Sequence, residues 1–260
     1  MLPGGVELIF DDERALAEVR LTRPEVRNAQ TMATWASLRQ AAEIIAGRGD
    51  IALALLRGTG DNFSAGLDLR MLRGGAPAGE GDLRELLAHD DADVDHAISD
   101  FQRAFTCWRE LPVIVVAAVT GHAIGAGFQL ALAADLRVLR DDAVLVMAEA
   151  SLGLVPDLGG TRRLVELTGY ARALEICATA GPIDAARAER IGLANAVFSE
   201  AEFDAGLDAY LGALLAVDRT ASRSVKSLIT HATTADPEAQ LAAERRAQVP
   251  LLRRVSGSTG

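Results

Sequence analysis

The sequence predicts an α/β fold with a mainly parallel sheet, followed by a C-terminal region built from helices. Apolar runs that fit buried strands, at 51–57 and 113–119, alternate with segments whose apolar residues recur every three to four positions. Strands joined by crossover helices pair in parallel. After residue 160 only 196–198 still fits a strand, so the last helices must pack on the core or on another subunit. With 260 residues, half of them apolar, the chain is long enough to bury a sizeable core.

The individual elements follow from apolar spacing and from the turns between them. Alternation predicts two N-terminal strands around the turn Asp-Asp-Glu-Arg, and apolar runs predict five more. The predicted strands are 5–10, 15–21, 51–57, 113–119, 136–139, 144–147 and 196–198. One predicted helix carries Ile98, Phe101, Phe105 and Trp108 on one face. The other predicted helices are 32–46, 128–134, 161–168, 170–179, 184–191, 203–216, 219–231 and 237–248. Residues 74–82, rich in glycine, are a flexible loop by composition.

The formal net charge of −10 arises from 36 acidic and 26 basic residues and is concentrated in one segment. Residues 80–100 hold eight acids and one arginine, so this segment carries −7 and the other 239 residues carry −3. An acidic protein repels polyanionic surfaces, which argues against nucleic acid and anionic membranes as partners.

Residues 111–134 are uncharged for 24 positions, which is long enough for a membrane span. Pro112, His122, Gln129 and three glycines interrupt this run, and its pattern changes midway from strand-like to helix-like. The N-terminal segment lacks the basic start and apolar core of a signal peptide. We therefore expect a cytoplasmic protein that does not span a membrane.

Two glycine-containing turns follow buried strands, at 63–69 and 125–129. Small residues let a ligand approach the backbone there, and the unpaired N–H groups of a following helix point at that ligand. Two such N–H groups that converge on one oxygen would form an oxyanion hole. The alternative is that the glycines merely make turns. A dinucleotide-binding motif is excluded, because Gly121, Gly125 and Gly127 do not have the spacing G-x-G-x-x-G.

Two carboxylates follow in the next part of the chain. Glu149 ends an apolar strand, where a carboxylate tends to have a raised pKa and suits general acid–base chemistry. Asp157 lies eight residues later, after Pro156 and before a predicted helix. Alone, Glu149 also fits a paired surface acid, and Asp157 also fits a turn residue or a helix cap.

At these residues the sequence resembles the crotonase superfamily, the enoyl-CoA hydratase/isomerase family. The resemblance extends from about Leu21 to Val197 and rests on four stretches in a specific order. The stretches are Leu21–Ala29, Phe63–Leu69, Pro112–Asp135 and Glu149–Thr161. It implies a crotonase-like ββα spiral core over residues 1–197, which binds acyl-CoA. Residues 198–260 would then form a helical region that covers the site and contacts other subunits.

The resemblance also implies how a substrate is held. The thioester carbonyl of an acyl-CoA would lie between the backbone N–H groups of Ala65 and Ala126, which would stabilise a thioester enolate. The residues that would surround CoA are Arg27, Ala29, Ala65, Gly66, Asp68, Leu69 and Gly125. Since most of the charge lies in 80–100, arginines such as Arg27 remain suited to CoA phosphates. We expect no metal and no cofactor beyond the CoA moiety of the substrate.

Gln129 departs from the family pattern of the hydratases, which hold a water between two glutamates at positions that correspond to Gln129 and Glu149. An amide holds a water but cannot exchange a proton at neutral pH. A single glutamate at the position of Glu149 is similar to that of enoyl-CoA isomerases, so we predict double-bond isomerisation with Glu149 as the proton shuttle. The alternatives are a 2-enoyl-CoA hydratase and an acyl-CoA-binding member with lost or altered catalysis.

Asp157 and the C-terminal region carry further expectations. The spacing from Glu149 to Asp157 is similar to that of the two proton-shuttling carboxylates of dienoyl-CoA isomerases. Asp157 also corresponds to the aspartate nucleophile of aryl-CoA dehalogenases, which is a weaker match.

The chain ends without the acidic-aromatic segment common in the family. Lys226, the only lysine, is expected on a solvated helix face. The resemblance predicts a homotrimer or a dimer of trimers.

Overall fold

A computed structural model describes residues 1–75, 77, 80 and 82–257 of the chain. Its main sheet has six strands in the order β1-β2-β3-β4-β6-β9, and a smaller sheet has the order β5-β7-β8. The strands of the main sheet are β1 (Val6–Asp11), β2 (Leu16–Leu21), β3 (Leu53–Gly58), β4 (Ile114–Val119), β6 (Leu136–Arg140) and β9 (Ala196–Phe198). Those of the smaller sheet are β5 (His122–Ile124), β7 (Val144–Val146) and β8 (Ile183–Asp184). Apart from the antiparallel pairs β1–β2 and β7–β8, all pairs are parallel, which confirms the predicted sheet.

Apart from the short helix Leu83–Leu86, which the sequence did not predict, the helices lie close to their predicted positions. They are α1 (Met32–Ala46), α2 (Leu83–Leu86), α3 (Asp91–Glu110), α4 (Ala126–Ala133), α5 (Gly160–Thr168), α6 (Tyr170–Thr179), α7 (Ala185–Arg190), α8 (Phe203–Leu215), α9 (Arg219–Ala232) and α10 (Pro237–Gly257). Helix α10 continues through Pro250, although the sequence predicts an end at residue 248. A proline has no N–H group, so one backbone carbonyl of the preceding turn loses its helical hydrogen bond. The residues around Pro250 are exposed, so that carbonyl can accept a hydrogen bond from water. The predicted loop at 74–82 lies partly outside the described residues.

Strand β5 was not predicted, because three residues between Gly121 and Gly125 show no alternation of their own. Its backbone pairs with β7, and Ala123 also forms a bridge with Ser64. The strand therefore exists through partners that are distant in sequence, and it brings the turn at 63–69 against the start of α4.

Both faces of the main sheet are covered. The larger core packs α1, α3 and α4 on one face around Trp35, Phe105 and Trp108, all of which are buried. The second face is covered by α8, whose Phe203 and Leu207 pack on sheet residues such as Leu55 and Val116. Helix α8 belongs to the predicted helical region, 198–260, yet its side chains form part of the core on this face of the sheet.

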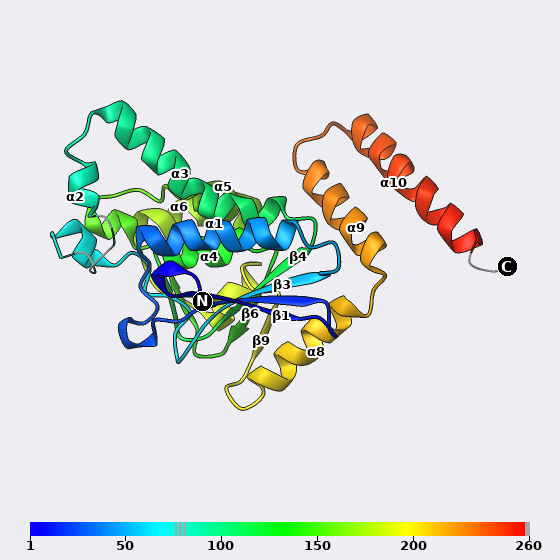
Figure 1. Ribbon diagram of the computed structural model, residues 1–260, viewed down its shortest axis with the longest axis horizontal. Coiled ribbons are helices and arrows are strands. Elements are labelled where there is room, and N and C mark those ends of the chain that lie inside the picture. The colour runs from blue at the N-terminus through cyan, green and yellow to red at the C-terminus, as the bar shows by residue number, and fades with distance from the viewer. Residues whose placement is uncertain (76, 78–79, 81, 258–260) are drawn as a thin grey trace.

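Helices α9 and α10 form a hairpin at one end of the molecule, with α10 on the side away from the sheet (Figure 1). The prediction that Lys226 of α9 is solvated is wrong, because its side chain is only 7% exposed. Its ammonium group donates to the carbonyl of Val113 at 2.8 Å and forms an ion pair with Asp135 at 2.7 Å. Arg223, one turn earlier, donates to the carbonyl of Ile51 at 2.8 Å. Cationic side chains on one face of α9 therefore hold the hairpin to backbone carbonyls that precede β3 and β4.

Candidate active site

A cavity of about 570 Å³ lies where the turn after β3, the start of α4 and the segment after β7 meet. The described part of its lining is mostly apolar, and its polar side chains are Glu149, Ser151 and Asp157. The apolar lining includes Leu67, Leu69, Leu72, Leu83, Leu86, Leu87, Val94, Ile98, Phe101, Leu152, Leu154 and Val155. A concave apolar site with a few convergent polar groups is typical of a small-molecule pocket.

Glu149 begins a short 3₁₀ helix, Glu149–Leu152, and is 9% exposed. Its Oε1 atom accepts a hydrogen bond from Nε2 of Gln129 at 2.8 Å, whereas Oε2 is buried and has no partner among the described residues. Burial raises the pKa of this carboxyl, and the charge of Asp157 raises it further. Gly125 permits the close approach, since a Cβ atom there would lie 3.3 Å from Oε1 of Glu149 and its φ is +51°. Glu149 is therefore a buried carboxylate suited to exchanging a proton within the cavity.

Gln129 is 1% exposed and lies beside Glu149 on the protein side rather than on the cavity wall. Its Oε1 atom accepts the backbone N–H groups of Leu158 at 3.0 Å and Gly160 at 3.2 Å. Both polar ends of the amide are thus bonded to protein groups. Gln129 therefore holds Oε1 of Glu149 and does not line this cavity.

Asp157 lines the same cavity as Glu149. It keeps solvent contact, but the surrounding protein walls raise the pKa of its carboxyl by desolvation. It does not cap the following helix, because the N-cap of α5 is Gly159. Its own carbonyl accepts a hydrogen bond from Gln102 of α3 at 2.7 Å, which ties this turn to the long helix. The structure therefore brings the two predicted carboxylates to one cavity.

The backbone donors differ from those that the resemblance implied. The N–H of Ala65 donates to the carbonyl of Arg27 at 2.8 Å, so it is not free for a ligand. The N–H groups of Leu67 and Ala126 have no hydrogen-bond partner among the described residues, and both residues line the cavity. Ala126 is the first residue of α4, where a helix leaves its N–H unpaired. Leu67 therefore takes the place of Ala65 as a free backbone donor at the cavity, together with Ala126.

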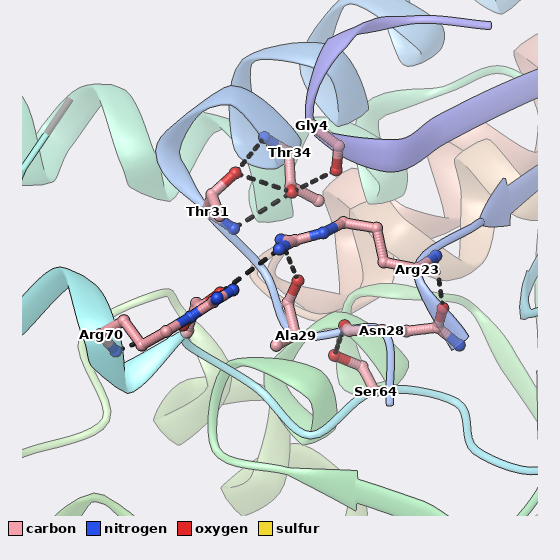
Figure 2. Close-up of polar contacts among 9 residues, drawn as sticks. Gly4, Arg23, Asn28, Ala29, Thr31, Thr34, Ser64 and Arg70 are labelled. Carbon is pink, nitrogen blue, oxygen red and sulfur yellow. Dashed lines mark hydrogen bonds and ion pairs between the residues drawn. The ribbon is translucent and has the colours of Figure 1, made fainter. Parts of the chain in front are cut away.

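A buried polar network, which the sequence did not predict, holds this turn in place. The hydroxyl of Ser64 donates to the carbonyl of Asn28 at 2.8 Å and accepts the N–H of Gly66 at 3.1 Å. Gln30 donates to the same hydroxyl at 3.0 Å (Figure 2 shows the Ser64–Asn28 bond). Because each of these groups is buried and bonded, the backbone on either side of Gly66 is fixed before a ligand arrives.

Of the residues predicted to surround CoA, Ala65, Leu69 and Gly125 line the cavity. Asp68 is 4% exposed and is paired with Arg70 at 2.6 Å and with Arg23 at 3.4 Å, so its carboxylate links two loops. Arg23 also donates to the carbonyl of Ala29 at 2.9 Å (Figure 2). Arg27 is exposed, so its guanidinium group is open to an anionic ligand.

Within residues 1–75, 77, 80 and 82–257, no group of three or more His, Cys, Asp and Glu side chains is arranged to hold a metal ion. In the same part of the chain, no helix has both the length and the apolar character needed to cross a membrane.

Comparison with known proteins agrees with the fold. A structure from Thermobifida fusca, named as a candidate enoyl-CoA hydratase and solved with acetoacetyl-CoA, is 43% identical, covers 96% of each chain and superposes with a TM-score of 0.90. A T. fusca structure of the same designation with CoA is 41% identical, covers 98% of this chain and 95% of that one, and gives a TM-score of 0.89. These similarities confirm the predicted crotonase-like fold.

Curated relatives include both hydratase and isomerase names. YngF of Bacillus subtilis, named as a candidate enoyl-CoA hydratase/isomerase, is 31% identical over 233 residues, which are 89% of this chain and 84% of YngF. The peroxisomal Delta(3,5)-Delta(2,4)-dienoyl-CoA isomerase of Arabidopsis thaliana is 30% identical over 189 residues, which are 72% of this chain and 67% of that protein. The family model for enoyl-CoA hydratase/isomerase matches residues 11–256. The chain therefore belongs to the enoyl-CoA hydratase/isomerase family.

Proposed function

We propose that this enzyme isomerises the double bond of an enoyl-CoA thioester, with Glu149 as the proton shuttle. The observation that carries the proposal is the pair of groups at Glu149: a carboxylate with one unpartnered oxygen, and an amide, Gln129, in place of a second acid. The carboxylate takes a proton from C2 of a 3-enoyl-CoA, and the electron pair moves into an enolate. Return of the same proton to C4 gives the 2-enoyl-CoA. The transfer is redox-neutral, so the proposed reaction uses no cofactor beyond the CoA moiety.

The enolate oxygen is held by the free N–H groups of Leu67 and Ala126 in this proposal. Each such donor typically contributes about 3 kcal/mol to transition-state stabilisation when it is preorganised in a dry site. The support from Ser64 and Gln30 provides that preorganisation on the side of Leu67. CoA itself would follow the edge near Arg27 and Leu69, and the bound acetoacetyl-CoA and CoA in the T. fusca structures support this class of ligand.

Hydration of 2-enoyl-CoA is the second candidate, favoured by the names of several relatives. It requires a water that is deprotonated by one group while carbon receives a proton from the same or another group. The amide of Gln129 cannot exchange a proton, and its oxygen is already used by two backbone N–H groups. An acyl-CoA-binding protein without catalysis is disfavoured by the buried carboxylate at Glu149, since a buried charge is costly to retain without a role.

Asp157 acts in this proposal through its charge on Glu149. Because its carboxylate raises the pKa of Glu149, Asp157→Asn lowers that pKa. We expect the acid limb of the pH–rate profile to move to lower pH. A direct proton transfer by Asp157 would instead be seen as loss of turnover with dienoyl-CoA substrates.

The test of the proposed function compares purified protein with 3-enoyl-CoA and 2-enoyl-CoA. We expect isomerisation to exceed hydration clearly and Glu149→Gln to abolish it, whereas the control Glu85→Gln, at an exposed acid, leaves it unchanged. Hydration at a rate comparable to isomerisation that survives Glu149→Gln contradicts the proposal. Tight acyl-CoA binding with no turnover of any enoyl-CoA supports the non-catalytic alternative.

We also propose assembly as a homotrimer or a dimer of trimers. Helices α9 and α10 expose large apolar side chains, among them Val225, Ile229, Leu241, Leu252 and Val255. Apolar side chains on a projecting hairpin are typical of a surface that another subunit covers. A monomer at micromolar concentration in light scattering contradicts this part of the proposal.

A further inference from the structure

We propose that a second cavity, lined by three arginines, binds a small carboxylate with a short apolar chain. This arginine cavity has a volume of about 360 Å³ and lies between the C-terminal ends of α3 and α9 and the start of α5. Its arginines are Arg109, Arg162 and Arg163. The inference goes beyond the proposed function, because it assigns a ligand to a site that the isomerisation does not use.

The arginine cavity is separate from the Glu149 cavity, the one of about 570 Å³ that Glu149 and Asp157 line. On α3, Nε2 of Gln102 donates to the carbonyl of Asp157 at 2.7 Å. One turn later, a Cβ atom placed on Gly159 would lie 3.3 Å from Cγ2 of Thr106, so helix and turn are in close contact. Among the described residues, Leu158 alone lines both cavities. A ligand can therefore occupy each cavity at the same time.

The three arginines share one carboxylate partner, Glu166 of α5. Its Oε2 atom lies 2.6 Å from Arg109 and 3.1 Å from Arg163, and its Oε1 atom lies 3.1 Å from Arg162. Burial alone would raise the pKa of Glu166, but the hydrogen bonds to these arginines lower it, so it is ionised at neutral pH. The other acid at the cavity, Glu110, is exposed. Three guanidinium groups thus face two carboxylates, which leaves one positive charge in excess.

Buried cations near Arg163 respond to this excess. Burial lowers the pKa of Lys226, and the charges of Arg109 and Arg163 lower it further, although Asp135 acts in the opposite direction. Burial lowers the pKa of Arg137 to about 9, and Arg163 again acts in the same direction. An anion bound in the arginine cavity would reduce this repulsion between cations.

The chemistry of the lining indicates the class of ligand. A guanidinium group binds carboxylate or phosphate through two parallel hydrogen bonds, and a single excess charge matches a monoanionic carboxylate better than a phosphate dianion. Ala133 is partly exposed at the cavity, and the buried side chains of Phe105 and Leu158 close it from the core side. These apolar groups suit a hydrocarbon chain. Because the volume of about 360 Å³ is near the lower end for small-molecule pockets, the chain must be short.

The first experiment titrates hexanoate into the full-length protein by calorimetry, with acetoacetyl-CoA present in excess to fill the Glu149 cavity. We expect hexanoate to bind with a Kd below about 1 mM, and neutral hexanamide and inorganic phosphate to bind at least about 10-fold more weakly. Hexanoate binding that acetoacetyl-CoA abolishes would place hexanoate in the Glu149 cavity and overturn the inference. Phosphate that binds as tightly as hexanoate would overturn the assignment to a carboxylate. A protein that binds hexanoate but isomerises no enoyl-CoA supports the arginine cavity and rejects only the proposed function.

The second experiment repeats the titration with variants that locate the ligand. Arg162→Gln removes the excess charge at a side chain that is 69% exposed, so little stability should be lost. Ala133→Leu fills part of the cavity and retains every arginine. Each variant should weaken hexanoate binding about 10-fold or more. The control Arg103→Gln, at an exposed arginine of α3 that does not line the cavity, should bind hexanoate as the native protein does. Native affinity in both Arg162→Gln and Ala133→Leu, with unfolding curves that show folded protein, overturns the inference.

Discussion

The ammonium group of Lys226 lies 2.7 Å from Oδ2 of Asp135, and the N–H of Val115 donates to the same oxygen, also at 2.7 Å. These bonds connect α9 to the segment before β6 and to β4. A buried contact therefore holds the C-terminal hairpin to the rest of the protein. Burial lowers the pKa of Lys226 although Asp135 acts in the opposite direction, so the ion pair offsets only part of the desolvation cost.

Lys226→Met should lower the free energy of unfolding by about 3 kcal/mol, because it leaves Asp135 with an uncompensated charge in a largely buried position. Urea unfolding monitored by circular dichroism measures this loss. The matched control, Arg103→Met, removes a cation from an exposed position of α3 and should change stability by less than about 0.5 kcal/mol. A double variant with Asp135→Asn should be more stable than Lys226→Met alone, and the absence of that recovery would argue against the ion pair.

Ala126→Pro removes one proposed enolate donor without breaking α4. Ala126 is the first residue of the helix, where proline is well tolerated and the preceding Gly125 accepts the restriction that proline imposes. We expect kcat/KM for isomerisation to fall about 10²- to 10³-fold with a nearly unchanged unfolding curve. Ala126→Ser, which retains the N–H, should remain within a few-fold of native activity; an equal loss in both variants would mean that the N–H is not the working group.

Ser64→Ala tests the buried network under the turn at 63–69. The substitution removes the hydroxyl that bonds the carbonyl of Asn28, the N–H of Gly66 and Nε2 of Gln30. The expected loss is about 2–3 kcal/mol in the free energy of unfolding, together with a lower kcat, because the Leu67 donor is displaced. Thermal unfolding and steady-state kinetics measure both effects. Native kcat in a destabilised Ser64→Ala protein would separate the network from catalysis.

Glu149→Gln should abolish isomerisation and also make the protein more stable at pH 8. Burial raises the folded-state pKa of Glu149 above its unfolded value, so its favourable contribution is complete below the unfolded pKa and is lost as pH rises through the folded pKa. A neutral glutamine avoids that loss and should gain about 1 kcal/mol at pH 8, with the gain shrinking near pH 4. Denaturant unfolding at both pH values provides the check; a gain that is the same at both would exclude titration of Glu149 as its cause.

The predicted strands and helices were largely correct, because the spacing of apolar residues along a segment shows which of its faces is buried. Strand β5 was missed, since its pairing with β7 and Ser64 lies outside its own three residues. Lys226 was placed in solvent, because an isolated lysine on a helix does not reveal that Asp135 is its partner. Both errors concern partners that the chain acquires only on folding.

By itself, the sequence determined the α/β class, the order of the elements and the presence of two carboxylates, Glu149 and Asp157, eight residues apart. These properties depend on local periodicity and on spacing along the chain. The tertiary structure decided which groups are free to act. The carbonyl of Arg27 occupies the N–H of Ala65 and leaves that of Leu67 available, and the backbone of 158–160 orients Gln129 toward Glu149. A hydrogen bond to a distant residue has no signature in local sequence, so only the fold shows which donor and which oxygen remain unpaired.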